Sequence, residues 1–182
     1  MDEKRIIHFN DLTPSYWSGG STTEIFIYPE GSDFKEGNYE IRFSVATVEV
    51  ATSTFTLLPN TQRTLTLLEG ELELDINGKK TSLKPFQSAD FLGDDQVTST
   101  GIAKDFNVIA QSGKPYYVRK VGYIKGEVTT ATLNEFDNMM IMVLQGCIEV
   151  EGKSLRYLDA CISDVSVSLK VIEEAYIILI GY

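Results

Sequence analysis

The chain has 182 residues, 43% of them hydrophobic, enough for one domain of ordinary size or two small ones with a packed core. Its formal net charge is −10 and its basic residues are scattered, which argues against non-specific nucleic-acid binding because such binding depends on phosphate neutralisation. No apolar run reaches the roughly 18 residues of a membrane helix, and the N-terminus lacks the apolar stretch of a secretory signal. We therefore expect a cytoplasmic protein that does not engage a membrane.

Most of the chain alternates between apolar and polar residues with a period of two, the signal of a half-buried strand. Along residues 39–45, the aromatic and aliphatic side chains share one face, and Glu40, Arg42 and Ser44 share the other. Residues 71–76 alternate in the same way, and Asn77-Gly78 then supplies a hairpin turn. In chain order, we predict strands over residues 6–9, 23–28, 39–45, 64–68, 71–76, 106–110, 116–124, 139–144, 165–172 and 176–180.

Helical periodicity is nearly absent, and the best candidate is a single turn around residues 133–138. Many short strands separated by frequent turn residues are typical of a sandwich or a barrel. The sequence therefore predicts an all-β protein.

An internal repeat lies on either side of a turn-rich seam at residues 111–115. Leu67-Leu-Glu-Gly-Glu-Leu-Glu-Leu74 corresponds to Val143-Leu-Gln-Gly-Cys-Ile-Glu-Val150, and a tight Gly turn follows each block, at Gly78 and at Gly152. The order strand, Gly, strand, turn, strand is preserved. We interpret the repeat as a duplicated unit.

Two cysteines, Cys147 and Cys161, do not form a C-x-x-C pair. In a cytoplasmic chain they are expected to be reduced, buried thiols. The one histidine, His8, falls in the predicted strand over residues 6–9, and we interpret it as structural.

The hairpin blocks are similar to those of cupin barrels, and a longer ordered series of motifs resembles the HutD/Ves family of bicupins. The series consists of Trp17-Ser-Gly-Gly-Ser-Thr-Thr-Glu-Ile25, Ile41-Arg-Phe-Ser-Val-Ala46, Thr54-Phe-Thr-Leu-Leu-Pro59, Arg63, Leu67-Leu-Glu-Gly70, Leu83-Lys-Pro-Phe86, Phe91-Leu-Gly-Asp94 and Asp105-Phe-Asn-Val108. Beyond residue 112, only the cupin-like hairpin continues the resemblance.

The resemblance implies a double cupin (bicupin) barrel, in which two related antiparallel β-barrel or jelly-roll halves pack into one unit. Residues 1–112 would form the barrel that carries the motifs. Residues 113–182 would form a shorter cupin-like half, with the option of sharing strands with the first. Homodimerisation is a further option, because cupin sheets often present an outer face to a partner.

The resemblance also implies a link, in some members, to histidine utilisation, whereas Ves-type members are associated with stress responses. No reaction is firmly attached to the family. Cupins that use a metal bring several histidines together, and this chain has one, so we expect no metal and no other cofactor. The family often carries Arg immediately before Glu24, where this chain has Thr23. If that Arg grips a ligand carboxylate, the ligand of this chain differs.

Two arginines are candidates for binding an anion. Arg42 offers a planar fork to a carboxylate and Ser44 offers a neutral hydrogen bond, provided that their strand face lines the interior rather than meeting solvent. Arg63 is either a second anion contact or a structural partner of Glu40 or Asp94.

The remaining candidates for the ligand site are short polar or pocket-walling residues. Trp17 precedes Gly19 and Gly20, and it would wall a pocket where glycine lets backbone N–H groups approach a ligand; the alternative is a core tryptophan. Asp105 and Asn107 share a strand face and would complete the pocket or bind turn backbone. Glu24 joins them as part of the early motif.

The leading hypothesis is a protein that binds a small carboxylate-bearing metabolite, as a sensor or auxiliary factor in histidine utilisation or related amino-acid catabolism. A second hypothesis is a metal-independent isomerase or hydrolase acting on a small polar acid, with Glu24, Asp94 and Asp105 as its acid–base groups. A third is a structural or interaction module without a ligand. The residue pattern does not choose between catalysis and binding alone.

Overall fold

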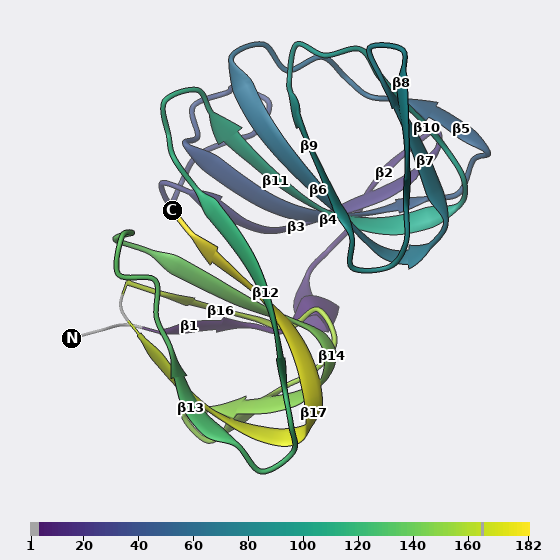
Figure 1. Cartoon of the computed structure of the whole chain (residues 1–182). Helices are drawn as coiled ribbons and strands as arrows, with labels where there is room; N and C mark the ends of the chain where they lie inside the picture. The colour runs from purple at the N-terminus through teal and green to yellow at the C-terminus, as the bar shows by residue number, and fades with distance from the viewer. Residues whose placement is uncertain (1–3, 165) are drawn as a thin grey trace. The chain divides into compact units, whose positions relative to one another are not determined.

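The computed structural model describes residues 4–164 and 166–182, and antiparallel β-strands make up nearly all of their regular structure (Figure 1). One short 3-10 helix, η1 (Phe9–Asp11), is present. The described residues contain no α-helix, and hence no helix able to span a lipid bilayer. The predicted helical turn near residue 133 is a hydrogen-bonded turn, in which the Phe136 N–H donates to the Leu133 carbonyl (3.1 Å). The all-β prediction is confirmed.

The chain divides into two compact units at Lys114 and Pro115, inside the predicted seam. One unit is Leu12–Lys114, hereafter the 12–114 unit. The other, hereafter the C-terminal unit, combines Pro115–Tyr182 with the first residues of the chain, up to Asp11. The division thus differs from the predicted 1–112 and 113–182, because β1 (Arg5–Ile7) pairs with a strand of the C-terminal unit.

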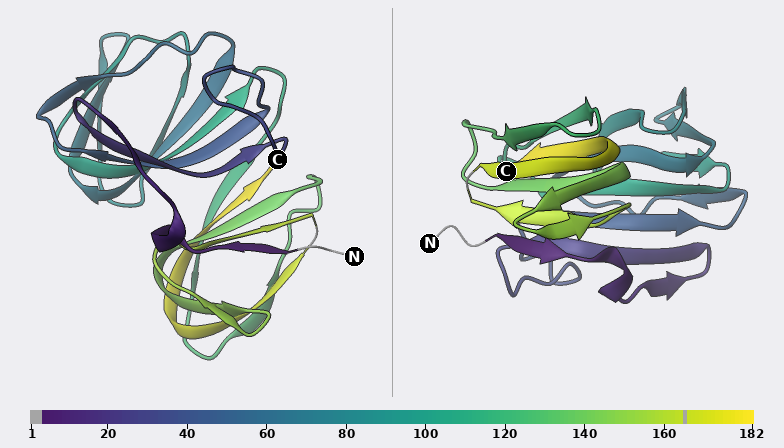
Figure 2. Two further views of the ribbon diagram at one scale, coloured as in Figure 1. Left: turned by 180° about the vertical axis from the view of Figure 1, so that it is seen from behind. Right: turned by 90° about the horizontal axis from the view of Figure 1, so that it is seen from below.

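The 12–114 unit contains two separate antiparallel sheets. Within each sheet the strands run side by side (Figure 2). The larger sheet has six strands in the order β2 (Ser15–Trp17), β3 (Gly20–Tyr28), β4 (Ile41–Val48), β11 (Ala103–Gln111), β6 (Thr61–Gly70) and β9 (Ser88–Leu92). The smaller sheet has four, in the order β5 (Thr52–Thr54), β10 (Val97–Thr100), β7 (Leu72–Ile76) and β8 (Lys79–Leu83).

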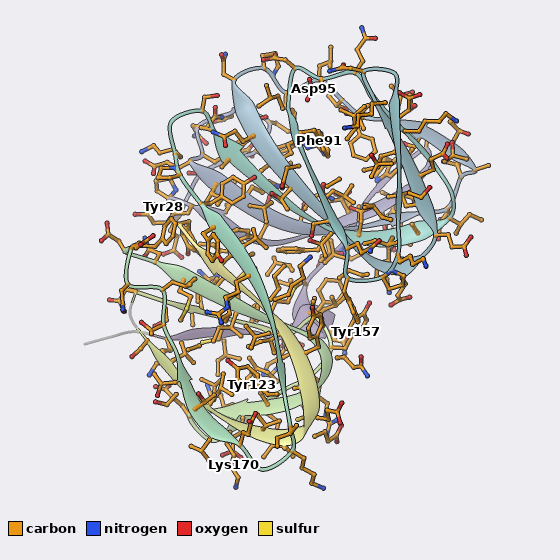
Figure 3. The ribbon with its side chains drawn as sticks, in the orientation of Figure 1. Tyr28, Phe91, Asp95, Tyr123, Tyr157 and Lys170 are labelled. Atoms are coloured by element: carbon orange, nitrogen blue, oxygen red, sulfur yellow. The ribbon has the colours of Figure 1, made fainter. Side chains whose placement is uncertain are left out.

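A hydrophobic core holds these two sheets together. Leu65 and Leu67 of β6 pack in one cluster with Leu72 and Leu74 of β7, and all four side chains are buried. Phe91 of β9 belongs to the same cluster, inside the unit (Figure 3). The hydrogen-bonded strands form open sheets rather than closed barrels. Burial of apolar area between the layers is therefore the main force that holds the sheets face to face.

The C-terminal unit is one seven-stranded sheet with an aliphatic core. Its main path is β1, β16 (Ala160–Ser163), β14 (Met139–Val150), β17 (Val167–Gly181) and β12 (Tyr117–Tyr123); β13 (Val128–Ala131) pairs with β17, and β15 (Lys153–Leu155) pairs with β14. Tyr123 packs against this core (Figure 3).

Two strands of this unit are longer than predicted. The segments predicted as 165–172 and 176–180 join in β17, and Val165 itself lies outside the described residues. β14 pairs with β17 from Met139 to Val150, with register shifts between Val143 and Ile148. These bulges let both strands bend without interruption, which a period of two in the sequence does not reveal.

The two predicted repeat blocks share one backbone feature, although β6 and β7 lie in different sheets whereas β14 runs through its block as one strand. Leu67 and Val143 occupy corresponding positions, and each exchanges backbone hydrogen bonds with a later turn. The Phe86 N–H donates to the Leu67 carbonyl (2.7 Å), and the Leu158 N–H donates to the Val143 carbonyl (2.8 Å). Both turn residues have positive φ, 68° and 67°. The sequence repeat thus reappears as matching backbone geometry.

The N-terminal segment is tied to this unit by Asp159. His8 lies just after β1 rather than within a strand, and its Nδ1 is 3.2 Å from Asp159 Oδ2. The Phe9 N–H donates to Asp159 Oδ1 (2.9 Å). These contacts give His8 a structural setting.

Both cysteines are buried, free thiols, and burial raises the pKa of Cys161 to about 11. Both thiols are fully buried and so out of reach of a reagent, and we therefore predict that neither cysteine reacts with a thiol reagent at about pH 8 in the native protein. Ellman's reagent checks this prediction, with the chain in denaturant as the control in which both thiols react. Rapid stoichiometric labelling of the native protein would contradict it.

Candidate functional site

Three adjacent strands of the 12–114 unit present polar side chains to its interior. β11 lies between β4 and β6, and Ile109 is paired with Arg42 on one side and with Arg63 on the other. Alternate residues of a strand share a face, so Asn107 and Asp105 follow Ile109 on this face. The sequence did not decide whether the strand face of Arg42 and Ser44 lines the interior or meets solvent. The structure places this face in the interior.

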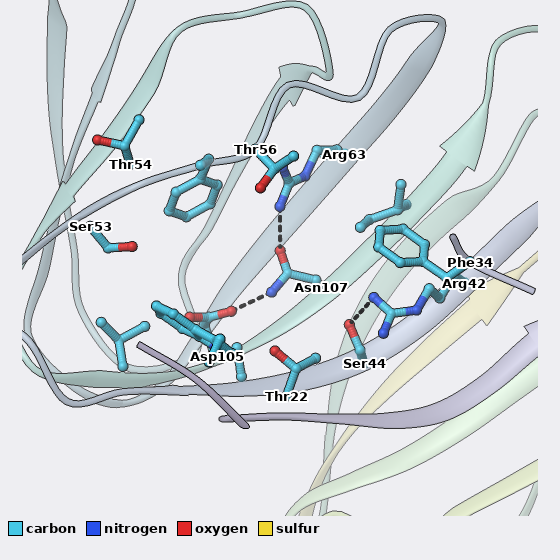
Figure 4. A pocket seen from close by; sticks show the side chains of 15 residues that line it. Thr22, Phe34, Arg42, Ser44, Ser53, Thr54, Thr56, Arg63, Asp105 and Asn107 are labelled. Carbon is cyan, nitrogen blue, oxygen red and sulfur yellow. Dashed lines mark hydrogen bonds between the residues drawn. The ribbon is translucent and has the colours of Figure 1, made fainter. Parts of the chain in front are cut away.

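A pocket of about 280 Å³ opens over these strands. Both sheets of the unit contribute to its lining (Figure 4). Its lining residues are Trp17, Thr22, Phe34, Arg42, Ser44, Ala46, Val48, Ser53, Thr54, Phe55, Thr56, Arg63, Asp105, Asn107 and Ile109.

The charge of Arg42 is compensated by its neighbours. Its Nε donates to Glu24 Oε2 at 2.7 Å, and its Nη1 donates to Ser44 Oγ at 3.2 Å. The guanidinium carbon lies 4.1 Å from the centre of the Phe34 ring, which adds a cation–π contact. Arg42 is thus held rigidly at the pocket wall by an internal ion pair.

Arg63 is in a different situation. It is 8% exposed, and its guanidinium carbon lies 5.0 Å from the ring centres of both Phe55 and Phe91. Its Nη2 donates to the neutral Asn107 Oδ1 at 3.4 Å, and its buried Nε has no hydrogen-bond acceptor among the described residues. Neither predicted ion-pair partner reaches it: Glu40 pairs with Lys114 (2.8 Å), and Asp94 lies in an exposed turn.

Burial lowers the pKa of Arg63 to about 10, although the nearby Asp105 and Tyr39 raise it. Arg63 therefore stays cationic at neutral pH. A buried cation without an ion-pair partner is unfavourable unless a counter-charge reaches it, because the lost hydration is not replaced.

Asn107 connects Arg63 to Asp105. Its Oδ1 accepts from Arg63, and its Nδ2 donates to Asp105 Oδ1 (Figure 4). Both ends of the amide are engaged, which orients it in one direction. The three residues form a short polar chain along the inner wall of the pocket.

Asp105 is the one carboxylate that lines the pocket, as far as the described residues go, and it is 2% exposed. Burial raises the pKa of Asp105 to about 7, against the opposing effects of the Asn107 hydrogen bond and of Arg63. Near neutral pH, its carboxyl group is therefore poised between the protonated and the ionised form.

Of the residues predicted for the ligand site, the structure brings six to the pocket: Trp17, Arg42, Ser44, Arg63, Asp105 and Asn107. Glu24 does not line it, because its carboxylate is bound to Arg42. Gly20 does not line it either. A Cβ at Gly20 would lie 1.9 Å from the Thr47 carbonyl oxygen, so the glycine permits the close approach of β3 to β4.

Sequence reasoning missed the aromatic contacts of both arginines. Phe55 lies within a segment of the matched motif series, which could have indicated it. Phe34 lies in an irregular segment with no local pattern that indicates a site. The sequence pattern placed Tyr39 only on the apolar face of its predicted strand. Burial raises its pKa, which Arg42 and Arg63 lower, so its hydroxyl lies in the field of both cations.

A second hollow, of about 300 Å³, lies in the C-terminal unit among Thr132, Asn134, Asn138, Asp164 and Ser166 with neighbouring apolar residues. It contains none of the predicted site residues. Within the described parts of the chain, no group of three or more His, Cys, Asp or Glu side chains is placed to hold a metal ion. The pocket of the 12–114 unit is therefore the better candidate site.

The environment of Asp105 predicts a pH dependence of stability. Since its pKa is higher in the folded protein than in the unfolded chain, the folded state holds the extra proton between about pH 4 and pH 7. The free energy of unfolding should fall as the pH rises through this window, by on the order of 2 kcal/mol between about pH 5 and pH 8. Asp105→Asn should lose this component.

Urea unfolding at both pH values measures the effect. Asp94→Asn, a change in an exposed turn, is the matched control and should keep the wild-type pH dependence. An Asp105→Asn variant with an unchanged pH profile would show that this carboxyl group titrates normally.

Comparison with known proteins agrees with this fold. The HutD family model matches residues 10–178, whereas no curated protein matches the chain significantly. Among solved structures, the chain is similar to the conserved protein of unknown function PA5104 from Pseudomonas aeruginosa PAO1, with a TM-score of 0.79, 24% identity and 98% of each chain covered. HutD from Pseudomonas fluorescens SBW25, in a formate condition, gives a TM-score of 0.76 at 22% identity, again over 98% of each chain.

A cupin 2 conserved barrel domain protein from Leptotrichia buccalis is similar at a TM-score of 0.64 and 13% identity, covering 97% of this chain and 95% of that one. At these identities the structural likeness establishes the fold alone. The family match spans nearly the whole sequence and confirms the resemblance predicted from the ordered motifs. The chain therefore belongs to the HutD family, with a cupin-type β-fold.

Proposed function

We propose that the protein binds a small carboxylate-bearing metabolite in the pocket of the 12–114 unit, as a sensor or auxiliary factor in histidine utilisation or related amino-acid catabolism. The observation that carries the proposal is Arg63, a buried cation that lines the pocket without an ion-pair partner among the described residues. A carboxylate at Arg63 would supply the missing counter-charge and form charge-assisted hydrogen bonds.

The pocket also provides the other elements that a small-molecule site needs. Ser44, Thr22 and Ser53 add hydroxyl groups to its wall, and Trp17, Phe34 and Phe55 add aromatic surface. A volume of about 280 Å³ suits a metabolite with a short carbon skeleton. The name of the HutD relative supports a link to histidine utilisation. The structure of that relative was determined in a formate condition, and formate, the simplest carboxylate, is therefore a convenient probe. A cytoplasmic location belongs to the same proposal.

We further propose that the chain is a double cupin whose halves have diverged in role. The matching backbone hydrogen bonds of the two repeat blocks support a duplication. The core cluster of the C-terminal unit consists mainly of aliphatic side chains, whereas the 12–114 unit carries arginines and a carboxyl group on its inner face. The first unit would bind the ligand, and the second would serve stability.

A thermal-shift screen tests the binding function with histidine, urocanate, formiminoglutamate, formylglutamate and glutamate. A ligand at about 100 times its Kd adds roughly 2.7 kcal/mol, which for a chain of this length raises Tm by roughly 5–10 °C. Arg63→Gln should weaken the binding of a hit by about 10- to 100-fold, because charge-assisted hydrogen bonds are lost. Arg156→Gln, at an exposed site in the C-terminal unit, is the matched control and should leave the shift intact.

A screen without any shift would contradict the proposed ligand class. An equal shift in the wild type and in Arg63→Gln would contradict the proposed site.

A second candidate function is a metal-independent isomerase or hydrolase, favoured by one observation: the pKa of Asp105 is near neutral, as a general acid–base group requires. Glu24 is engaged by Arg42 and Asp94 is exposed, so Asp105 would act without a second carboxylate in the pocket. Turnover of any of the five compounds, lost in Asp105→Asn and retained in Asp94→Asn, would support the enzyme. Binding without turnover would leave the sensor proposal.

A further inference from the structure

The two pocket arginines differ in how much charge they offer to a ligand. Arg42 already has a carboxylate, Glu24, at 2.7 Å. Arg63 contacts only the neutral Asn107 at 3.4 Å and the rings of two phenylalanines, and its Nε lacks an acceptor within the described structure. Of the two pocket arginines, Arg63 is therefore the one that has no ion-pair partner among the described residues and is open to an anionic group.

The second constraint is Asp105. It lies at the other end of the polar chain that starts at Arg63, and both residues line the same pocket. A carboxylate that binds Arg63 therefore places a second negative group near the same cation as Asp105. Two ionised carboxylates sharing one buried cation are unfavourable, and one of them becomes protonated.

We infer that a carboxylate of the ligand binds Arg63 while Asp105, where it is ionised, takes up one proton from the solvent. This inference rests on the proposed binding function and adds a proton coupling to it. No covalent step is involved: where Asp105 starts ionised, the carboxylate at Arg63 brings one negative charge, the proton brings one positive charge, and the net charge around Arg63 and Asp105 does not change.

The charged groups around Asp105 agree on the direction of the coupling. Arg63 of β6 faces it and favours its ionised form, and Asn107 on its own strand donates to it. On the β4 side, Arg42 carries its own counter-ion, Glu24 of β3, and Tyr39 precedes that strand with a raised pKa. When a ligand anion neutralises Arg63, the main favourable charge for ionised Asp105 is lost. The pKa of Asp105 must then rise above its ligand-free value of about 7.

Linkage makes the coupling reciprocal: if the anion favours the proton, the proton favours the anion. Binding should be strongest below about pH 7 and should weaken by up to about tenfold for each pH unit above it, until the pKa of the liganded state is reached.

Formate is the probe for the first experiment, since it is fully ionised above about pH 6. The carboxyl carbon of Asp105 is followed by ¹³C NMR across a pH titration, with and without formate, and is assigned by its loss in Asp105→Asn. Formate should raise the titration midpoint of Asp105 by at least about one pH unit. The readout uses the wild-type protein, so it does not depend on how a variant folds.

Two variants locate the effect. Asp105→Asn should bind formate with an affinity that does not vary between about pH 6 and pH 9, and Arg63→Gln should abolish the shift. Arg156→Gln in the other unit should behave as the wild type.

An unchanged Asp105 titration at the highest formate concentration that leaves the protein folded would overturn the inference. Calorimetry at about pH 8, where Asp105 is mostly ionised without ligand, in two buffers of different protonation enthalpy gives the proton count for any hit from the metabolite screen. A metabolite that binds without proton uptake would overturn the inference and leave the binding function intact. A flat metabolite screen with proton-coupled formate binding would reject the proposed metabolites and leave the coupling intact.

Discussion

The candidate site depends on the pairing register of β4, β11 and β6. This register sets Arg42, Ile109 and Arg63 in one row and places Asn107 and Asp105 below them on the same face. A slip of one residue in β11 would turn its polar side chains to the other face, where Phe106 and Val108 now lie fully buried. The row of charged and hydrogen-bonded side chains along the pocket wall follows from this alignment.

This arrangement buries two arginine charges, which is unfavourable, and the protein compensates the two charges to different extents. Around Arg42, an internal carboxylate, a hydroxyl group and an aromatic ring replace water. Around Arg63, the replacement is incomplete, and the nearby carboxyl group is itself displaced towards its neutral form. Unsatisfied buried groups are rare in folded proteins because each one destabilises the fold, and they concentrate where a ligand completes them.

The two units share one turn geometry but have different interiors. The repeat blocks share turn geometry and hydrogen bonds, yet one interior holds arginines and a carboxyl group, and the other holds aliphatic side chains. An apolar interior stabilises without a ligand, since burial of aliphatic area is favourable by itself. A polar interior must pair its charges. The difference in side chains on a common backbone is what separates a candidate binding unit from a structural one.

The sequence by itself determined the strand content, the repeat, the family and most of the polar residues that line the pocket, because a period of two and ordered motifs are local properties of the chain. It did not determine that β1 joins the C-terminal unit, that β14 and β17 run without interruption, or that Gly20 serves strand approach and Glu24 neutralises Arg42. These are contacts between residues far apart in the sequence. Only the tertiary structure decides which of two similar arginines finds a counter-ion, since that depends on which side chains the sheet register brings within hydrogen-bonding distance.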